Sequence, residues 1–274
     1  MPPRPYLDAP WPLLFAHRGG LGVAPENTLA AFRGALELGF RYLETDVHLT
    51  ADGALVTIHD PTLDRTSDAQ GPVRARTLAE LRGVDAGHRF TADGGRTFPF
   101  RGQGIAVPTL EEVLALDPRV RVNIEIKERD EAVVRAVYDL IIRLQVQDRV
   151  LVASEHAHQT RAFRALAGDR VATSAGAADL WRFFLAVRSG IGVRRRPAYD
   201  ALQLPPTHGP LRVVTPRLVD AAHRLGLHVH VWTINDPGEM RRLLALGVDA
   251  VMSDFPALLQ ATAAGFAGPP RATG

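Results

Sequence analysis

The 274-residue chain contains no cysteine. Disulfide bonds, thiolate metal sites and a cysteine nucleophile are therefore excluded. The chain also lacks any apolar run of about 18 residues, the length that a membrane-spanning helix needs. The short apolar stretch 11–16 ends at His17-Arg18, which makes it a poor signal peptide. We therefore expect a soluble, cytoplasmic protein.

Lysine is almost absent, since Lys127 is the only lysine among 32 basic residues. The net charge is only +2, so the sequence pI of 9.4 reflects arginine, which stays protonated at alkaline pH. It does not reflect a large basic excess, and we expect no nucleic-acid partner. With 46% apolar and 23% charged residues, the chain can bury a core and fits one large domain.

A helical pattern, a glycine and an apolar strand recur in residues 38–46, 225–233 and 246–254. Glycine commonly follows a helix, and this order is typical of parallel βα units. Strands are predicted at Leu13–His17, Tyr42–Val47, Val120–Ile126, Val150–Ala153, Arg170–Ser174, Ala201–Leu204, His228–Thr233 and Ala250–Ser253. Helices are predicted at Asn27–Leu38, Leu110–Leu116, Asp130–Gln145, Thr160–Ala167, Ala178–Val187, Thr215–Leu225 and Pro237–Leu246. This pattern predicts a (β/α)8 TIM barrel, with a doubly wound open sheet as the alternative.

Two domain boundaries and one insertion follow from the same pattern. We expect an N-terminal arm at 1–12, a single barrel domain at 13–262 and a flexible tail at 263–274. A long insertion, at about residues 50–109, follows the second strand, and loops of this length are usually functional. The insertion begins with a hairpin signal at Asp52-Gly53.

Three carboxylates lie toward the carboxyl ends of two predicted strands, at the end of the barrel where active sites lie. Glu44 and Asp46 are two residues apart and so share one strand face, and Glu125 lies two residues before Lys127. Three inward carboxylates repel one another unless a cation lies between them. An all-oxygen donor set suits Ca²⁺ or Mg²⁺. The alternative is ion pairing with Arg18 and Lys127, without a metal.

His17 and His59 are the candidates for proton transfer, because imidazole titrates near neutral pH and both lie beside charged residues at the barrel mouth. His228 and His230 share a strand face and are secondary candidates for the pocket lining. We interpret the other histidines as structural or surface residues; they are His48, His88, His156, His158, His208 and His223.

Taken together, these motifs resemble the glycerophosphodiester phosphodiesterase family, in the family's order from about residue 13 to 259. The matching motifs are His17-Arg18-Gly19, Glu26-Asn27-Thr28, Glu44-Thr45-Asp46, His59-Asp60, Asn123-Ile124-Glu125-Ile126-Lys127, Trp232-Thr233 and Ser253-Asp254-Phe255-Pro256. The resemblance implies a metal-dependent TIM-barrel enzyme that hydrolyses glycerophosphodiesters to glycerol phosphate and an alcohol. It also implies roles for matching positions: metal ligands Glu44, Asp46 and Glu125, acid–base residues His17 and His59, and substrate- or phosphate-binding residues Arg18, Lys127 and Trp232.

Two segments depart from the family pattern. Ser154-Glu155-His156 stands where the family commonly has Ser-Phe, so polar groups replace an apolar wall of the leaving-group pocket. The segment Trp181–Arg196 combines aromatic and basic residues, which is typical of peripheral membrane contact or of an ordinary barrel helix. Two other functions therefore stay open: hydrolysis of lysophospholipids at a membrane surface, and an inactive barrel that binds a phosphorylated ligand.

Overall fold

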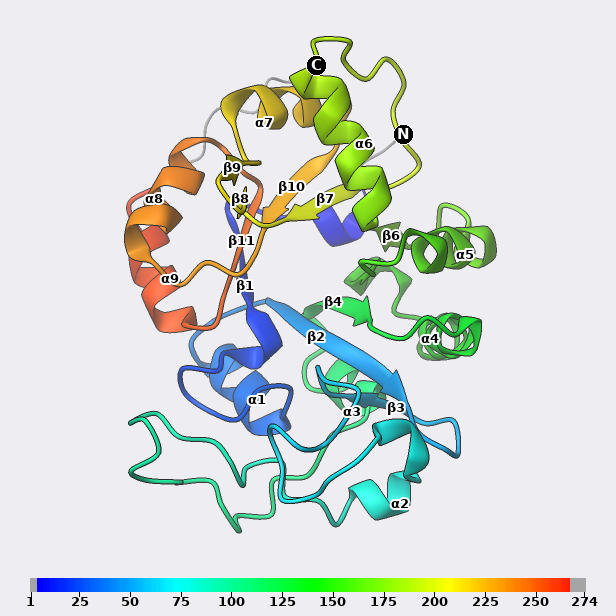
Figure 1. Cartoon of the computed structure of the whole chain (residues 1–274), viewed down its shortest axis with the longest axis vertical. Helices are drawn as coiled ribbons and strands as arrows, with labels where there is room; N and C mark the ends of the chain where they lie inside the picture. Colours follow the sequence, from blue (N-terminus) through cyan, green and yellow to red (C-terminus); the bar gives the residue numbers. More distant parts are fainter. Residues whose placement is uncertain (1–3, 267–274) are drawn as a thin grey trace.

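The computed structural model describes residues 4–266, and eight parallel strands form its central barrel (Figure 1). In sheet order they are β6 (Ala172–Thr173), β5 (Val150–Ala153), β4 (Arg121–Ile126), β2 (Tyr42–Leu49), β1 (Leu13–Ala16), β11 (Ala250–Ser253), β10 (His228–Val231) and β7 (Ala201–Leu204). A parallel bridge between Ser174 and Ala201 joins the two end strands and nearly completes the ring. The TIM-barrel prediction is confirmed, and the sheet is not an open doubly wound one.

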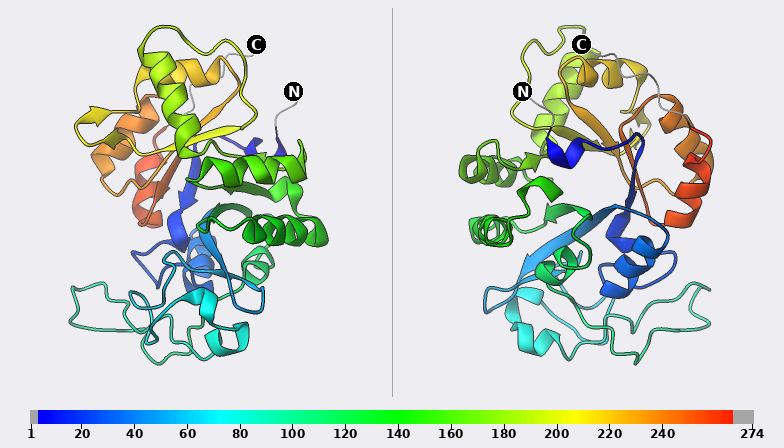
Figure 2. Two further views of the ribbon diagram at one scale, coloured as in Figure 1. Left: turned by 45° about the vertical axis from the view of Figure 1, so that its right-hand side comes forward. Right: turned by 180° about the vertical axis from the view of Figure 1, so that it is seen from behind.

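A helix follows each strand and packs on the outside of the ring (Figure 2). These helices are α1 (Leu29–Glu37), α3 (Leu110–Leu114), α4 (Glu131–Leu144), α5 (Ala157–Ala167), α6 (Ala177–Arg188), α7 (Pro216–His223), α8 (Pro237–Ala245) and α9 (Pro256–Ala263). Thr28, Asp130, Thr215 and Asp236 cap four of them by accepting a backbone N–H of the first turn. Helix α9 was not predicted, because its small and apolar residues show weak amphipathic periodicity.

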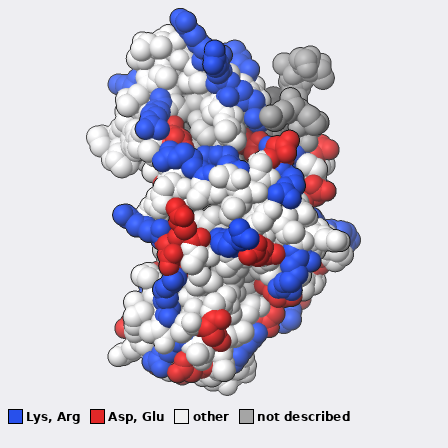
Figure 3. Space-filling view, turned by 90° about the vertical axis from the view of Figure 1, so that its right-hand side faces the viewer, with Lys and Arg blue, Asp and Glu red and all other residues white. Residues whose placement is uncertain are grey.

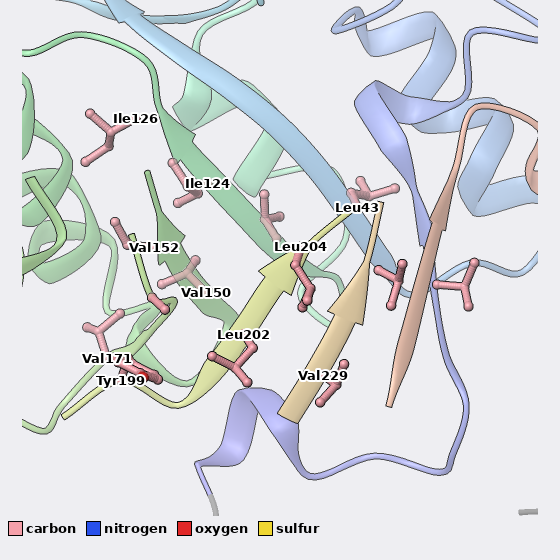
Figure 4. Packing of buried hydrophobic residues seen from close by; sticks show 14 of the residues in the cluster. Leu43, Ile124, Ile126, Val150, Val152, Val171, Tyr199, Leu202, Leu204 and Val229 are labelled. Atoms are coloured by element: carbon pink, nitrogen blue, oxygen red, sulfur yellow. The ribbon is translucent and has the colours of Figure 1, made fainter. Parts of the chain in front are cut away.

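Alternate residues of each strand face the helices or the barrel interior. The outward set packs against the helices and includes Leu43, Ile124, Val152 and Leu202 (Figure 4). The inward residues form a second apolar cluster, with Phe15 and Tyr42 at its centre. Along β2 the inward series is therefore Tyr42, Glu44 and Asp46, which runs from an apolar floor to a charged mouth.

The floor of the barrel is covered by η1 (Pro5–Leu7). The Tyr42 hydroxyl donates a hydrogen bond to the Tyr6 carbonyl at 2.8 Å, and the two rings pack edge to face with centroids 5.5 Å apart. The expected N-terminal arm thus contacts the amino ends of the strands. The domain boundaries stay predictions, and the expected tail lies outside the described residues from 267 onward.

The insertion after β2 has a small core of its own. Strand β3 (Leu55–Thr57) pairs antiparallel with β2, which confirms the predicted hairpin. It is followed by η3 (Val73–Ala75) and α2 (Leu78–Leu81), whose Val73 and Leu81 are fully buried with Leu63. Because this cluster fixes the chain on both sides of His59, it positions that residue at the barrel mouth. Within residues 4–266, no helix is both long and apolar enough to cross a bilayer.

Candidate active site

The three predicted metal ligands lie together on β2 and β4. Asp46 pairs with Glu125 in the register of the two strands, and Glu44 is one inward position deeper. Each residue offers a carboxylate oxygen within 4.8 Å of the other two. Glu44 and Asp46 are only 2% and 1% exposed. The structure therefore brings together the carboxylates that the sequence predicted.

Two cations lie against this cluster. The Lys127 Nζ is 2.9 Å from Asp46 Oδ1 and 3.0 Å from Glu125 Oε1. The Arg18 Nε is 3.2 Å from Asp46 Oδ2. Burial alone would lower the pKa of Lys127, but the carboxylates of Asp46 and Glu125 outweigh it and raise that pKa. The predicted ion pairs thus exist, and they involve Asp46 and Glu125.

The negative charge of Glu44 is compensated far less than the charges of Asp46 and Glu125. Its Oε2 accepts the backbone N–H of Arg18 at 3.0 Å and lies 3.7 Å from His17 Nε2. Among the described residues, no lysine or arginine side chain forms an ion pair with it. Burial, followed by repulsion from Asp46, raises the pKa of Glu44 to about 7. Three carboxylates against two cations leave a negative charge that a divalent ion would neutralise, so the donor set fits a metal.

Asn27 holds Asp46 in place. Its Nδ2 donates to Asp46 Oδ2 at 2.9 Å, and its Oδ1 accepts from the Thr45 hydroxyl at 2.7 Å. Asn27 has a positive φ of 56°, a conformation that asparagine tolerates better than most residues. Sequence analysis predicted no role for this residue beyond its place in a motif, so its contact with Asp46 is a finding of the structure.

His17 lies in η2 (His17–Gly19), directly after β1, and its ring is held by Asp254. The Nδ1 lies 2.7 Å from Asp254 Oδ1, and Asn235 Nδ2 donates to Asp254 Oδ2 at 2.7 Å. Burial would lower the pKa of His17, but Glu44 and then Asp254 outweigh it and raise that pKa. Because Nδ1 is engaged, Nε2 is the atom that faces the carboxylate cluster.

His59, which follows the β2–β3 hairpin, has the same arrangement. Its Nδ1 lies 2.7 Å from Asp60 Oδ1, and Arg65 Nε donates to Asp60 Oδ2 at 2.7 Å. The hydrogen bond from Arg65 lowers the pKa of Asp60 to about 2, although partial burial of this carboxyl acts in the opposite direction. Arg65 also binds both oxygens of Glu26, which in turn accepts from Arg18 at 3.1 Å. The two histidines are therefore each oriented by an aspartate, an arrangement typical of general acid–base residues.

The predicted substrate residue Trp232 follows β10 and is 41% exposed. It lines a cavity of about 230 Å³ together with Glu125. His230, a secondary candidate for the pocket, is instead wholly buried, and its Nδ1 lies 3.2 Å from Gln203 Nε2. The roles of Asp254 and Asp60 as histidine partners were missed, although a carboxylate at a strand end and one next to His59 were signals for them.

Both departures from the family pattern lie around this cavity. Ser154 and Glu155 line it, but the Glu155 side chain is 69% exposed. In the segment Trp181–Arg196, Phe183, Phe184 and Val187 are buried and cannot contact a bilayer. Basic side chains gather at the upper end of the face in Figure 3, where Figure 1 places α6 and the loop after it.

Comparison with known proteins gives one consistent result. Residues 17–258 match the model of the glycerophosphoryl diester phosphodiesterase family. The chain is 33% identical to a glycerophosphodiester phosphodiesterase of Caldanaerobacter subterraneus subsp. tengcongensis, covering 90% of this chain and 96% of the relative. A solved structure of the Agrobacterium tumefaciens enzyme of that name has 28% identity and a TM-score of 0.73, covering 91% of this chain and 99% of that one.

A phosphodiesterase from Oleispira antarctica, solved in complex with the product sn-glycerol-3-phosphate, has 27% identity and a TM-score of 0.74. It covers 93% of this chain and 97% of its own. The similarity thus extends over the whole barrel and includes the segments that carry both histidines and all three carboxylates. On this evidence the chain belongs to the glycerophosphoryl diester phosphodiesterase family and is a phosphoric diester hydrolase of glycerophosphodiesters.

Proposed function

We propose that the hydrolysis depends on one divalent metal ion, Ca²⁺ or Mg²⁺, held by Glu44, Asp46 and Glu125. The observation that carries this proposal is the buried Glu44 carboxylate, which faces two other carboxylates and, within residues 4–266, forms no ion pair with a lysine or arginine side chain. Both ions prefer oxygen ligands, and all three groups supply oxygen. When bound, the ion adds positive charge to the site where the phosphodiester anion sits.

Arg18 and Lys127 bind the phosphate oxygens in this proposal. The planar guanidinium of Arg18 can bind two oxygens side by side, whereas the ammonium of Lys127 acts as a compact charge. Their present partners, Asp46 and Glu125, hold both groups at the mouth before substrate arrives. Positive charge fixed in advance stabilises the additional negative charge of the transition state.

His17 and His59 move the protons. One imidazole Nε2 accepts a proton from the attacking water or glycerol hydroxyl, and the other protonates the alcohol oxygen as its bond to phosphorus breaks. Attack by water gives glycerol phosphate directly, whereas attack by the glycerol hydroxyl gives a cyclic phosphate, whose ring P–O bond water then breaks. Asp254 and Asp60 keep each ring in the tautomer that leaves Nε2 available. Water is consumed, and glycerol phosphate and an alcohol are released. The product bound to the Oleispira antarctica neighbour supports glycerol phosphate as the product here.

The test is alcohol release from glycerophosphocholine before and after exhaustive EDTA treatment. We expect activity to vanish and to return with Ca²⁺ or Mg²⁺, and the concentration needed for each ion identifies the resident metal. Glu44→Gln removes one ligand charge, so calorimetry should show weaker ion binding at an unchanged fold. Full turnover after EDTA treatment would exclude the metal proposal while leaving the family assignment intact.

Two further features are supported only by sequence and surface chemistry. The cytoplasmic location stays a prediction. Peripheral membrane contact also stays a prediction, supported by exposed apolar residues on and after α6, namely Leu185 at 58% and Ile191 at 75% exposure. The exposed Arg194 and Arg195 follow them and suit an anionic surface.

A further inference from the structure

The cavity beside Glu125 occupies one side of the barrel mouth. It is lined by residues at the carboxyl ends of β5, β6 and β7, by Trp232 after β10, and by the first half of α6. Glu125 therefore belongs both to the carboxylate cluster and to the cavity wall. A single substrate can place its phosphate at the cluster and another part of itself in the cavity.

Helix α6 supplies most of one wall. Leu180, Phe183 and Phe184 lie three or four residues apart, so they share the helix face that points inward. Aliphatic side chains form the opposite wall; they are Leu204, Pro205, Val213 and Leu218. The cavity is thus walled mainly by hydrocarbon groups.

Trp181 closes the outer side of this cavity. Its ring packs edge to face against Phe184, with centroids 5.6 Å apart, and against His208, with centroids 5.0 Å apart. His208 belongs to a short hairpin of β8 (Thr207–His208) and β9 (Leu211–Arg212). The tryptophan therefore joins α6 to this hairpin and extends the apolar wall to the surface.

Two polar groups of the lining, the Ser154 hydroxyl and the Gln203 side-chain nitrogen, already have hydrogen-bond partners. The Ser154 hydroxyl donates to the Ile126 carbonyl at 2.7 Å. Gln203 Nε2 donates to Asn123 Oδ1 at 2.7 Å and contacts His230 Nδ1 at 3.2 Å. A hydroxyl-rich or charged group would therefore lose hydration in the cavity without gaining matching hydrogen bonds.

We infer that this cavity binds a hydrocarbon chain joined to the phosphodiester, so that the enzyme prefers acyl- or alkyl-bearing substrates to glycerophosphodiesters of small polar alcohols. The inference rests on the proposed function, because it places the scissile phosphate at the ion held partly by Glu125. Aromatic rings beside carboxylates can also hold a quaternary ammonium group. Aliphatic walls and an outward-turned Glu155 favour the hydrocarbon chain instead.

The test compares kcat/KM across substrates kept below their micelle concentration in the presence of metal. One series carries acyl chains of rising length on the glycerol of glycerophosphocholine, and a second carries alkyl chains on the leaving alcohol. Each methylene that enters an apolar site raises kcat/KM by about fourfold until the cavity is full. The series that shows this rise identifies the side of the phosphodiester that bears the chain.

Substitutions in the cavity wall then test whether the cavity causes the preference for chain-bearing substrates. Leu180→Asn and Trp181→Ala should each lower kcat/KM for the best chain-bearing substrate at least ~10-fold more than for glycerophosphocholine, since both remove apolar surface. Ala178→Asn is the matched control, because Ala178 is exposed on the same helix but outside the cavity lining. It should leave both values unchanged. Circular dichroism and melting temperature check the fold of every variant.

The outcomes separate the two proposals. If neither chain series exceeds glycerophosphocholine, or if wall variants reduce all substrates equally, the cavity does not bind a hydrocarbon chain. A strong preference for choline over ethanolamine esters that Trp181→Ala abolishes would assign the cavity to a quaternary ammonium group and overturn the inference. If EDTA leaves turnover unchanged, the metal proposal fails independently of the chain-length result.

Discussion

The barrel mouth has two unlike halves. Beside β11, β1, β2 and β4 it carries the three clustered carboxylates and the two aspartate-bound histidines, His17 and His59. Over β5, β6, β7 and β10 it carries an apolar cavity. In the charged half, the raised pKa of Glu44 shows that burying this carboxylate beside Asp46 costs free energy. The apolar half gains stability because it buries the aromatic residues Phe183 and Phe184 of α6. The carboxylate cluster and the apolar cavity are thus neighbouring parts of one mouth, and they share Glu125.

Removing a histidine should damage the charged half most. We expect His17→Ala and His59→Ala each to lower kcat by ~10²- to 10⁴-fold, because each removes a general acid or base. His223→Ala is a matched control, since that histidine contacts Asp249 away from the cluster. Steady-state kinetics on glycerophosphocholine, with circular dichroism for the fold, measure the effect. A variant of either active-site histidine with near-normal kcat would remove that residue from the mechanism.

Lys127→Arg should lower kcat/KM by ~10²-fold although it keeps the positive charge. The compact ammonium fits between Asp46 and Glu125 at 2.9 and 3.0 Å, and a planar guanidinium cannot reproduce that position. Losing one well-placed cationic donor typically costs an effect of this size. If the variant keeps wild-type kcat/KM, simple charge suffices at this position. The presence of a single lysine in the chain would then carry no functional meaning.

The charged half was predictable from sequence because its carboxylates lie near the carboxyl ends of strands. In a parallel barrel the strand ends meet at one mouth, so Glu44, Asp46 and Glu125 could be placed from spacing alone. The aspartate partners of the histidines could not be placed from spacing alone. Asp254, for example, lies at the other end of the barrel sequence from its partner His17. Only the pairing of β1 with β11 shows that they meet.

The apolar half was not predictable in the same way. Periodicity indicated a helix near 178–187, but not which side of it faces the mouth. The aromatic residues therefore suited either a membrane surface or an ordinary barrel helix. Phe183 and Phe184 are buried and line the cavity, as in a barrel helix. The opposite wall includes Val213, which lies just after a hairpin too short to show a strand pattern. The apolar half of the mouth is formed by contacts between segments that are far apart in the sequence, and local sequence patterns do not predict such contacts.

Histidines in the two halves should also titrate in opposite directions. Nearby carboxylates raise the pKa of His17, whereas burial among apolar groups lowers the pKa of His230 to about 3. The unfolded chain binds a proton at His230 near the ordinary pKa of 6.5, but the folded chain does not until about 3. Stability from the neutral ring is therefore present above pH 6.5 and is lost as the pH falls through that value.

The expected loss is about 2 kcal/mol at pH 5, roughly a 30-fold change in the folding equilibrium. We expect urea unfolding to show wild type losing about that much more stability than His230→Gln between pH 7 and pH 5. The comparison between the two proteins removes the contribution of other groups. Equal pH dependence would mean that His230 is protonated or hydrated in the folded chain.

The smallest effect concerns the outer rim of the apolar half. Trp181, Leu185 and Ile191 are 37%, 58% and 75% exposed, and basic residues follow them, so this rim can approach an anionic membrane. Each arginine near such a surface contributes about 1 kcal/mol, so Arg194→Ser and Arg195→Ser should each weaken vesicle binding about fivefold. Co-sedimentation with phosphatidylserine-containing vesicles at low salt measures this, and added salt should abolish it. Absence of binding by wild type would show that chain-bearing substrates reach the cavity from solution.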